Sequence, residues 1–434
     1  MASDRQWGFK TRALHAGGQP DKATGARAVP IYQSTSFVFE DTADAADLFA
    51  LQKYGTIYSR ISNPTTSAFE ERMASLEGGI GSVATASGQA AEFLSITTLA
   101  GAGDHVVSAA GLYGGTYTLF ATTLARLGLE TTFVDNSSVD AFAAAITDRT
   151  KLLYTEVIGN PSGAVADLEA LADVAHASGI PLVVDATFAT PYLCRPIEFG
   201  ADIVVHSATK FLGGHGTSIG GVVTEAGTFD WTASGRFDRF TEPVPTYNNL
   251  RWHDNFGEYA FCTALRSEQL RDVGACLSPF NAFLLLQGVE TLAQRMDDHV
   301  ANARAVAEWL EADARVDWVA HADLPSSPYH DLARKYLPLG CGAIFTFGLK
   351  GGRKAGQRFI ESLQMVSHLA NVGDARTLVI HPASTTHQQL TDEQLELAGV
   401  GADMVRLSIG LEDLDDILWD LDQALEQARA VAGA

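Results

Sequence analysis

The sequence has few cysteines and a small share of basic residues. Its four cysteines, Cys194, Cys262, Cys276 and Cys341, are far apart and form no CxxC pair. We therefore expect neither a disulfide framework nor a metal site, and predict reduced, mostly buried thiols. Only 30 lysines and arginines stand against 52 acidic residues, a formal net charge of −22. Because a nucleic-acid or anionic-membrane partner requires a basic face, this balance argues against both.

Long apolar runs and targeting segments are also missing. No stretch has the length of an uninterrupted membrane helix, and Met1–Lys10 contains no apolar signal core. We therefore expect a cytoplasmic protein with no membrane partner. The 434 residues are 46% apolar and 19% charged. This balance is typical of a globular chain of roughly two or three domains.

The pattern of apolar and turn-forming residues divides the chain into three predicted parts. Residues 1–65 lack sustained periodicity and contain several glycines and prolines, so we predict an extended arm with turns. Residues 66–275 alternate short apolar strands with helices, which favours a mainly parallel sheet covered by helices. Residues 276–434 mix helices with short strands and predict a smaller C-terminal α+β domain. The predicted fold class is therefore α/β.

Four strands and a helix are predicted most clearly in the second part. The helix spans Asp167–Ser178, with Asp167 placed to cap its start and Gly179 to end it. Its apolar face consists of Leu168, Leu171, Ala172 and Ala175. The strands are His105–Ala109, Leu152–Ile158, Pro181–Asp185 and Asp202–His206. Residues 226–275 are aromatic and predicted to be irregular, ahead of a helix that contains Phe280–Leu286.

An aspartate and a lysine follow two of these strands. Asp185 ends one strand, and Lys210 follows the next in His206-Ser207-Ala208-Thr209-Lys210. Since parallel strands open their carboxyl ends at one edge of a sheet, both side chains can reach the same crevice. An aspartate facing a lysine is the arrangement that binds pyridoxal 5′-phosphate (PLP): the lysine forms an imine with the cofactor, and the aspartate keeps its pyridine nitrogen protonated. Either residue alone has a simpler structural explanation, so the pair carries the prediction.

Small polar residues nearby predict a site for a phosphate group. Ser207 and Thr209 flank the lysine with hydroxyl groups, and Gly88 and Gln89 open a helix-prone stretch. The backbone N–H groups at a helix N-terminus can bind phosphate, although many helices begin in this way. The glycines that follow Lys210 lack the Walker lysine and the GxGxxG spacing, so we predict no nucleotide loop there.

Four further side chains have both a functional and a structural interpretation. Tyr58 and Arg60 either bind a phosphate or line a solvated loop. Tyr113, in the glycine loop Gly111-Leu112-Tyr113-Gly114-Gly115, either stacks on a cofactor ring or packs. Arg406 lies in the apolar strand Val405–Ile409, where a buried arginine is costly without an anion. Arg406 either forms a salt bridge with a carboxylate of the protein or binds the carboxylate of a substrate.

Together these residues resemble the Cys/Met-metabolism family of PLP-dependent enzymes. The match is most specific from Asp202 to His215, where Ser207-Ala208-Thr209-Lys210-Phe211-Leu212-Gly213-Gly214-His215 follows the family's lysine motif. Further matches extend from Tyr58 to Glu412. The resemblance implies an aspartate-aminotransferase-like fold (fold type I), in which subunits form dimers that usually pair into tetramers.

The resemblance also implies a role for each candidate residue. Lys210 would hold PLP as a Schiff base and move protons, Asp185 would face the pyridine nitrogen, and Asn160 would lie near the ring hydroxyl. Tyr113 would stack on the ring and is a second candidate for proton transfer, whereas Arg406 would bind the substrate's carboxylate. The remaining cofactor-binding residues would be Gly88, Gln89, Thr187, Ser207 and Thr209, with Tyr58 and Arg60 reaching the phosphate of the neighbouring subunit.

Three stretches resemble the O-acetylhomoserine sulfhydrylase branch of this family. Leu369–Asp374 contains Asn371, where the lyases typically have serine, and we count Asn371 as substrate-binding. The stretch 378–390, whose His381 and His387 receive no role, and the long region before Leu277–Phe283 also fit this branch. Gly115 stands where methionine γ-lyase usually has a cysteine, which counts against a lyase.

The predicted activity is therefore γ-replacement on O-acetyl-L-homoserine by sulfide, giving L-homocysteine and acetate for methionine biosynthesis, by a homotetramer. The nearest alternative is a cystathionine γ-synthase or a γ-lyase with the same cofactor. A non-catalytic PLP-fold binding protein is the alternative from another class, and the presence of both Lys210 and Asp185 argues against it. The sequence leaves open acetyl against succinyl esters and sulfide against methanethiol.

Overall fold

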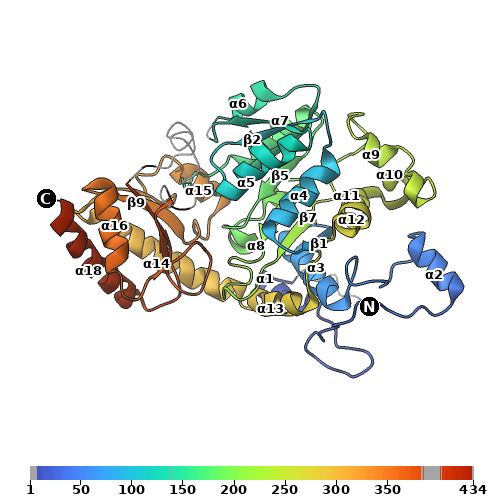
Figure 1. The fold of residues 1–434 in the computed structure, drawn as a ribbon, viewed down its shortest axis with the longest axis horizontal. Coiled ribbons are helices and arrows are strands. Elements are labelled where there is room, and N and C mark those ends of the chain that lie inside the picture. The colour runs from blue at the N-terminus through green and yellow to red at the C-terminus, as the bar shows by residue number, and fades with distance from the viewer. Residues whose placement is uncertain (1–6, 137, 383–384, 386–400, 402, 433–434) are drawn as a thin grey trace.

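Two β-sheets form the centre of the structure (Figure 1). The computed structural model describes residues 7–136, 138–382, 385, 401 and 403–432. The first sheet has seven strands between residues 81 and 225, and the second has five between residues 316 and 408. In Figure 1 the larger sheet lies in the middle of the molecule and the smaller one toward the C-terminal end, with the N-terminal segment at the opposite end.

The larger sheet has the strand order β1-β7-β6-β5-β4-β2-β3. Strands β6, β5, β4, β2 and β3 are parallel, whereas β7 is antiparallel to both of its neighbours. The strands are β1 (Gly81–Thr85), β2 (His105–Ala109), β3 (Glu130–Val134), β4 (Thr150–Glu156), β5 (Leu182–Asp185), β6 (Ile203–Ser207) and β7 (Gly221–Glu225). The parallel block presents its carboxyl ends at one edge, where the loops that carry functional residues begin.

The four predicted strands are confirmed as β2, β4, β5 and β6, with ends that agree to within two residues. Their apolar side chains are fully buried, as expected for a parallel sheet covered on both faces. Strands β1, β3 and β7 were not predicted from the sequence. Of these, β3 has no fully buried residue, and β1 and β7 pair antiparallel with each other outside the βαβ rhythm.

The predicted helix is α7 (Leu168–Ala177), and its four apolar residues are buried as expected. Gly179 follows it with a positive φ of 67°, a conformation that favours glycine. The expected cap by Asp167 is wrong, because this side chain makes no hydrogen bond to the helix. Its carboxylate instead accepts the Tyr336 hydroxyl and lies 3.6 Å from Lys335 Nζ, both from helix α15 (His330–Tyr336).

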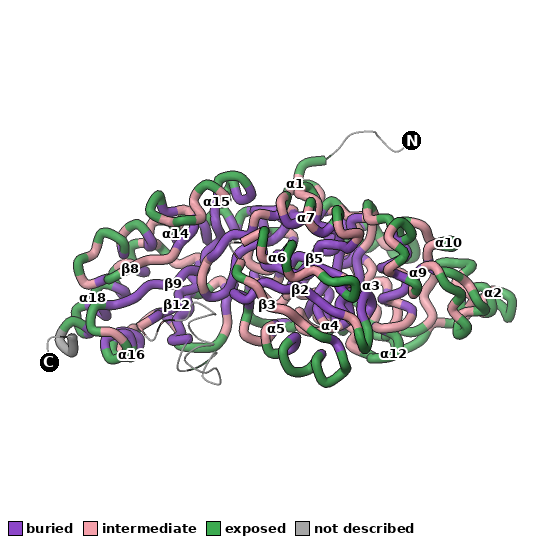
Figure 2. Tube along the Cα trace, turned by 90° about the horizontal axis from the view of Figure 1, so that it is seen from above, coloured by how far each residue is buried: buried purple, intermediate pink, exposed green. Residues whose placement is uncertain are grey.

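The N-terminal segment is more helical than predicted. It contains α1 (Phe9–His15) and α2 (Thr42–Phe49), before α3 (Pro64–Glu77) packs beside the larger sheet. Helix α2 forms because Asp41 accepts the N–H groups of Ala43 and Asp44, a local cap that periodicity does not reveal. Figure 2 shows α2 exposed at the edge of the molecule.

The region 226–275 is irregular only in its first half, so the prediction is wrong for the second. Short helices α9 (Asp238–Thr241) and α10 (Trp252–Phe256) lead into a continuous helical run from 260 to 273, which comprises α11 (Ala260–Ala264), a π-helical segment (Leu265–Leu270) and α12 (Arg271–Val273). Buried Phe261, Leu265 and Leu270 give this run an apolar face. The helix predicted around Phe280–Leu286 is confirmed as α13 (Pro279–Glu290).

The smaller sheet has the order β10-β11-β12-β9-β8. Its strands are β8 (Val316–Ala320), β9 (Ile344–Leu349), β10 (Ser367–His368), β11 (Leu378–Ile380) and β12 (Met404–Ser408). Helices α16 (Gly352–Ser362) and α18 (Leu414–Ala432) pack against each other beside it, and α14 (Leu292–Ala312) runs from the larger sheet toward it (Figure 1). His381 is buried just after β11, whereas His387 and most of 383–390 lie outside the described residues.

No helix in the described part of the chain is both long and apolar enough to cross a membrane. The same residues contain no group of three histidine, cysteine or acidic side chains arranged for a metal ion. All four cysteines are free thiols, and three of them are buried, which confirms the prediction for these residues.

Candidate active site

A cavity of about 290 Å³ lies where the carboxyl edge of the larger sheet meets the smaller sheet. Eleven of the thirteen predicted site residues line it, and Tyr58 and Arg60 do not. The eleven residues come from the start of the helix after β1, from the loops after β2 and β4, from the ends of β5 and β6 and the loops that follow them, from the segment between β10 and β11, and from β12. The lining set is Gly88, Gln89, Tyr113, Asn160, Asp185, Thr187, Ser207, Thr209, Lys210, Asn371 and Arg406.

Asp185 lies at the end of β5 and lines the cavity. The Thr187 N–H donates to Asp185 Oδ1 at 2.7 Å, and Thr187 Oγ1 accepts the Ser207 N–H at 2.8 Å. These bonds tie the ends of β5 and β6 together. Burial raises the pKa of Asp185, and the hydrogen bonds from Thr187 oppose that shift. A cationic ring nitrogen is a suitable partner for such a carboxylate.

The N-terminus of α4 (Gly88–Leu99) opens onto the cavity beside Ser207. The Ser87 hydroxyl accepts the Ala90 N–H, which leaves the first N–H groups of the helix, on Gly88 and Gln89, free to bind an anion. A Cβ on Gly88 would lie 2.6 Å from Ser207 Cβ, so only glycine allows this close approach. The turn and the Ser207 hydroxyl together form a cradle of the kind that binds phosphate.

Lys210 follows β6 and extends into the cavity. Its Nζ donates to Asn371 Oδ1 at 2.6 Å, and no carboxylate in the described part of the chain forms an ion pair with it. Burial and the nearby charge of Arg406 lower the pKa of Lys210 to about 8. The amine is therefore neutral in part near physiological pH, as a nucleophile or a base must be.

Arg406 lies in β12, between β9 and β11, and is only 5% exposed. Its Nη1 donates to Asn160 Oδ1 at 3.0 Å. Within the described residues no carboxylate is close enough to form an ion pair with it, which argues against the internal salt bridge considered above. Burial lowers the pKa of Arg406 to about 10. A buried guanidinium that faces a cavity without an anion is a binding site for a carboxylate or a phosphate.

Tyr113 is 46% exposed at the mouth of the cavity. Its backbone N–H donates to Glu156 Oε1 at 2.7 Å, which fixes the glycine loop to the end of β4. A Cβ on Gly115 would lie 2.5 Å from the Tyr113 ring, so the absence of a side chain at position 115 permits this ring position.

Tyr58 and Arg60 lie away from this cavity. Arg60 Nη1 donates to the carbonyl of Arg271, and its guanidinium lies 5.5 Å from the centre of the Tyr58 ring. Tyr58 is 41% exposed. Within one subunit neither residue is among those that line the site.

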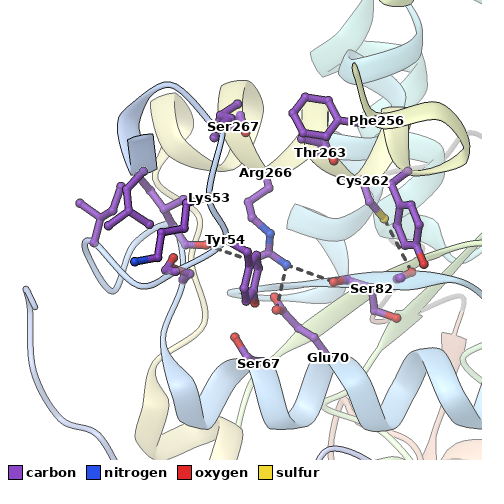
Figure 3. Close-up of a pocket in the computed structure, with 18 of the residues that line it drawn as sticks. Lys53, Tyr54, Ser67, Glu70, Ser82, Phe256, Cys262, Thr263, Arg266 and Ser267 are labelled. Atoms are coloured by element: carbon purple, nitrogen blue, oxygen red, sulfur yellow. Dashed lines mark hydrogen bonds and ion pairs between the residues drawn. The ribbon is translucent and has the colours of Figure 1, made fainter. Parts of the chain in front are cut away.

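A larger cavity of about 650 Å³ lies between the N-terminal segment and the helical run that begins at Ala260, and Figure 3 shows its lining. Arg266 in its wall donates to Glu70 Oε2 at 2.8 Å and to the Ser82 carbonyl at 3.1 Å. The guanidinium is thus neutralised within the protein, in contrast to Arg406. None of the predicted site residues lines this cavity, so we do not assign the active site to it.

Sequence reasoning missed two acidic residues of the site. Glu92 on α4 and Glu156 at the end of β4 line the same cavity as Asp185 and are buried. Glu92 lies one helical turn after Gly88, so the spacing within the helix could have revealed it. Glu156 lies four residues before Asn160, at a strand end like Asp185.

The residues of this cavity fit PLP. An anion cradle, a carboxylate and an amine of lowered pKa line one volume, which matches the phosphate, the ring nitrogen and the aldehyde of that cofactor. When bound, it would be held by Lys210, Asp185 and the N-terminus of α4.

The comparisons with known proteins agree with this assessment. The family model described as Cys/Met metabolism PLP-dependent enzyme matches residues 10–426. The chain is 53% identical over 422 residues to the homocysteine synthase of Schizosaccharomyces pombe, covering 97% of this chain and 98% of that protein. It is 50% identical to the O-acetyl-L-homoserine sulfhydrylase 1 of Thermus thermophilus, covering 96% of this chain and 99% of that protein.

A solved structure from Campylobacter jejuni, provisionally designated an O-acetylhomoserine (thiol)-lyase, superimposes with a TM-score of 0.94. The two chains are 38% identical over 97% of this chain and 100% of that one, and the Campylobacter protein carries N′-pyridoxyl-lysine-5′-monophosphate. The predicted fold class is confirmed: an α/β, aspartate-aminotransferase-like fold with a mainly parallel central sheet and a smaller C-terminal α+β part.

Proposed function

The chain belongs to the Cys/Met-metabolism family of PLP-dependent enzymes, and we propose that it catalyses γ-replacement on O-acetyl-L-homoserine by sulfide, producing L-homocysteine and acetate. The names of its relatives at about 50% identity support this reaction over a γ-lyase or a non-catalytic binding protein. The observation that carries the proposal is a buried Arg406 that lines the same cavity as Lys210 and has no carboxylate partner among the described residues, because this combination suits an α-amino acid.

The cofactor is PLP. When bound, it supplies an electron sink that stabilises negative charge on the substrate's Cα. We propose that Asp185 faces its ring nitrogen, that Tyr113 covers its ring, and that Asn160 lies near its ring hydroxyl. The phosphate would be bound by Gly88 and Gln89 at the N-terminus of α4 together with Thr187, Ser207 and Thr209.

Lys210 is the proposed proton carrier. Because burial and Arg406 lower its pKa to about 8, its Nζ can accept a proton at neutral pH and return it. The reaction requires removal of protons from Cα and Cβ before acetate leaves from Cγ, and their return after sulfide has added at Cγ. The hydrogen bond from Lys210 Nζ to Asn371 Oδ1 at 2.6 Å would hold the amine on the substrate side of the cavity.

Arg406 is the proposed carboxylate site. Asn160 holds one end of its guanidinium at 3.0 Å and leaves the remaining N–H groups for the two oxygens of an α-carboxylate. Fixing the carboxylate sets the orientation of the substrate's Cα–H bond toward Lys210. Tyr113 at the mouth of the cavity is a second candidate for proton transfer, near Cγ.

We also propose a cytoplasmic homotetramer built from dimers with shared active sites, whose product serves methionine biosynthesis. In support, the N-terminal segment exposes three large apolar side chains that contact with a neighbouring subunit would bury: Val38 is 100%, Phe49 62% and Tyr54 81% exposed. Tyr58 and Arg60 belong to this segment and would reach the phosphate in the neighbouring subunit.

The reaction is tested by incubating the PLP-loaded enzyme with O-acetyl-L-homoserine, with and without sulfide, and identifying the amino-acid product. Homocysteine formed only with sulfide is expected. Formation of 2-oxobutyrate and ammonia regardless of sulfide would place the enzyme among the γ-lyases instead. O-succinyl-L-homoserine and methanethiol, tested in parallel, would determine the ester and the thiol.

Shared active sites are tested by mixing subunits of Lys210→Ala and Arg60→Ala variants, each inactive alone. In mixed dimers one site has both defects and the other has neither, so random exchange should restore about one quarter of the wild-type activity. If mixing restores nothing while exchange is demonstrated by mass, each site is complete within one subunit.

A further inference from the structure

Three carboxyl groups line the cavity that we assign to PLP: Glu92 from α4, Glu156 from β4 and Asp185 from β5. Glu92 and Glu156 are 3% and 5% exposed. Within the described residues none of the three forms an ion pair, because Lys210 and Arg406 donate to amides instead. Three buried carboxyl groups in one small volume cannot all be ionised, so at least one carries a proton.

Glu156 and Asp185 accept hydrogen bonds from the backbone. Glu156 accepts the Tyr113 N–H on Oε1 and the Asn160 N–H on Oε2, at 2.7 and 3.2 Å. Asp185 Oδ1 accepts the Thr187 N–H at 2.7 Å. Burial and the charge of Asp185 raise the pKa of Glu156 as well, so a raised pKa does not by itself distinguish it from Glu92. The difference between the two residues lies in their hydrogen-bond partners.

Glu92 has a different set of partners. Its Oε1 accepts two hydroxyl groups, from Thr116 at 2.8 Å and Tyr154 at 3.1 Å, and its Oε2 accepts the Gln89 amide at 2.9 Å. Its carboxyl group is also in hydrogen-bond contact with that of Asp185. Two carboxyl groups in such contact require a proton between them. Since Oε1 already serves two donors, Oε2 is the oxygen that can carry this proton.

We propose that Glu92 is a protonated carboxylic acid that donates to Asp185, and thereby keeps the Asp185 carboxylate ionised and directed at the ring nitrogen of PLP. Glu92 is then a positioning residue, since it acts on the cofactor only through Asp185. The proposal rests on the assignment of Asp185 to the ring nitrogen under the proposed function.

The electrostatics agree with this geometry. Burial and the charge of Asp185 raise the pKa of Glu92 to about 8, so the protonated form prevails at neutral pH. The Tyr154 hydroxyl stays neutral because burial and the surrounding carboxyl groups raise its pKa well above the ordinary value. A protonated Glu92 also removes one negative charge from the cluster, which leaves Asp185 as the carboxylate that a ring cation neutralises.

Two substitutions distinguish the protonated form from the ionised form. In Glu92→Gln the amide oxygen can accept from Thr116 and Tyr154 while its NH2 group donates to Asp185. The Gln89 amide, which donates to Oε2 in the wild type, can rotate by 180° to present its oxygen to that NH2 group, so the variant reproduces a protonated glutamate. In Glu92→Leu the donor to Asp185 is lost. We expect the PLP affinity of the cofactor-free protein to stay within about threefold in Glu92→Gln and to fall about ten- to one-hundredfold in Glu92→Leu.

The decisive measurement is infrared spectroscopy of the holoenzyme, in which a protonated carboxyl group gives a C=O band separate from carboxylate and amide bands. Part of this band should disappear in Glu92→Gln. Glu156→Gln is the matched control: its NH2 group would face a backbone N–H, so cofactor affinity should fall there although the substitution is chemically the same.

An unchanged infrared band in Glu92→Gln, or a loss of cofactor affinity equal to that in Glu92→Leu, would overturn the proposal, because Glu92 would then be ionised. The product assay on the wild-type enzyme separates this outcome from a failure of the proposed function. If the Glu92 results are as expected but no homocysteine forms, only the assigned reaction is wrong.

Discussion

Replacing Arg406 tests whether its guanidinium binds the substrate's carboxylate. The side chain is 5% exposed and has an amide, Asn160, as its hydrogen-bond partner. Arg406→Leu would leave the substrate's carboxylate without its buried cationic partner. Loss of one member of such a buried charged pair costs about 2–5 kcal/mol. Because about 1.4 kcal/mol corresponds to tenfold, kcat/KM for O-acetyl-L-homoserine should fall about 30- to 4000-fold.

Arg406→Lys keeps the charge but removes the planar fork of N–H groups. An ammonium group cannot bind Asn160 and both oxygens of a carboxylate in one plane. The loss should therefore be smaller, about 10- to 100-fold in kcat/KM, and should appear mainly in the KM for the amino acid. Comparing the two variants separates the effect of the positive charge on kcat/KM from the effect of the planar arrangement of N–H groups.

The assay is steady-state kinetics with each substrate varied in turn. Sulfide has no carboxylate, so its KM should stay at the wild-type value in both variants. 3-Aminopropyl acetate, which is the substrate without its carboxylate, should react equally slowly with wild type and Arg406→Leu. If Arg406→Leu also slows this amine, or if the KM for sulfide rises with it, Arg406 supports the fold of the site and does not bind the carboxylate.

Three other variants test the rest of the site. Lys210→Ala should abolish both turnover and the visible absorbance of bound cofactor, and persistence of both would exclude Lys210 as the attachment site. Gly88→Ala should weaken PLP binding about 5- to 100-fold in a titration of the cofactor-free protein, because the added Cβ would lie 2.6 Å from Ser207 Cβ. Burial lowers the pKa of Lys210 from 10.5 to about 8, so the folded cofactor-free protein binds fewer protons than the unfolded chain between these pH values. Its stability should therefore rise with pH across that window, and Lys210→Met should raise the melting temperature by a few degrees at pH 7, with no gain left above about pH 10.5.

The sequence was most informative where function depends on strand ends. Asp185 and Lys210 follow parallel strands that the apolar pattern identifies, and a parallel sheet necessarily brings those ends to one edge. Asn160, which was assigned from the family resemblance, also follows a parallel strand, β4. These residues could be assigned to one site before any coordinates were known.

Contacts between distant segments were not predictable in this way. Helix spacing places Glu92 one turn after Gly88, and Glu156 stands at a strand end, but only packing shows that both side chains point into the cavity that contains Asp185. The failed cap at Asp167 has the same origin, since Tyr336 and Lys335 are more than 160 residues away along the chain. Helix-capping and strand-end rules use only the neighbouring residues in the sequence. A hydrogen-bond partner from a distant element can therefore give a side chain a different role from the one these rules predict.

Lys210 and Arg406 are held in the same way, each by an asparagine side chain from the opposite sheet or from the segment beside it. Lys210 comes from the larger sheet and is held by Asn371 from the segment beside the smaller one, whereas Arg406 comes from the smaller sheet and is held by Asn160 from the larger. An amide oxygen fixes a cation in place without neutralising it, which a carboxylate would do. The lysine therefore keeps a pKa low enough to move protons, and the arginine keeps its charge for the substrate. Each amide also ties one sheet to the other, so a displacement of the smaller sheet would release both cations at once.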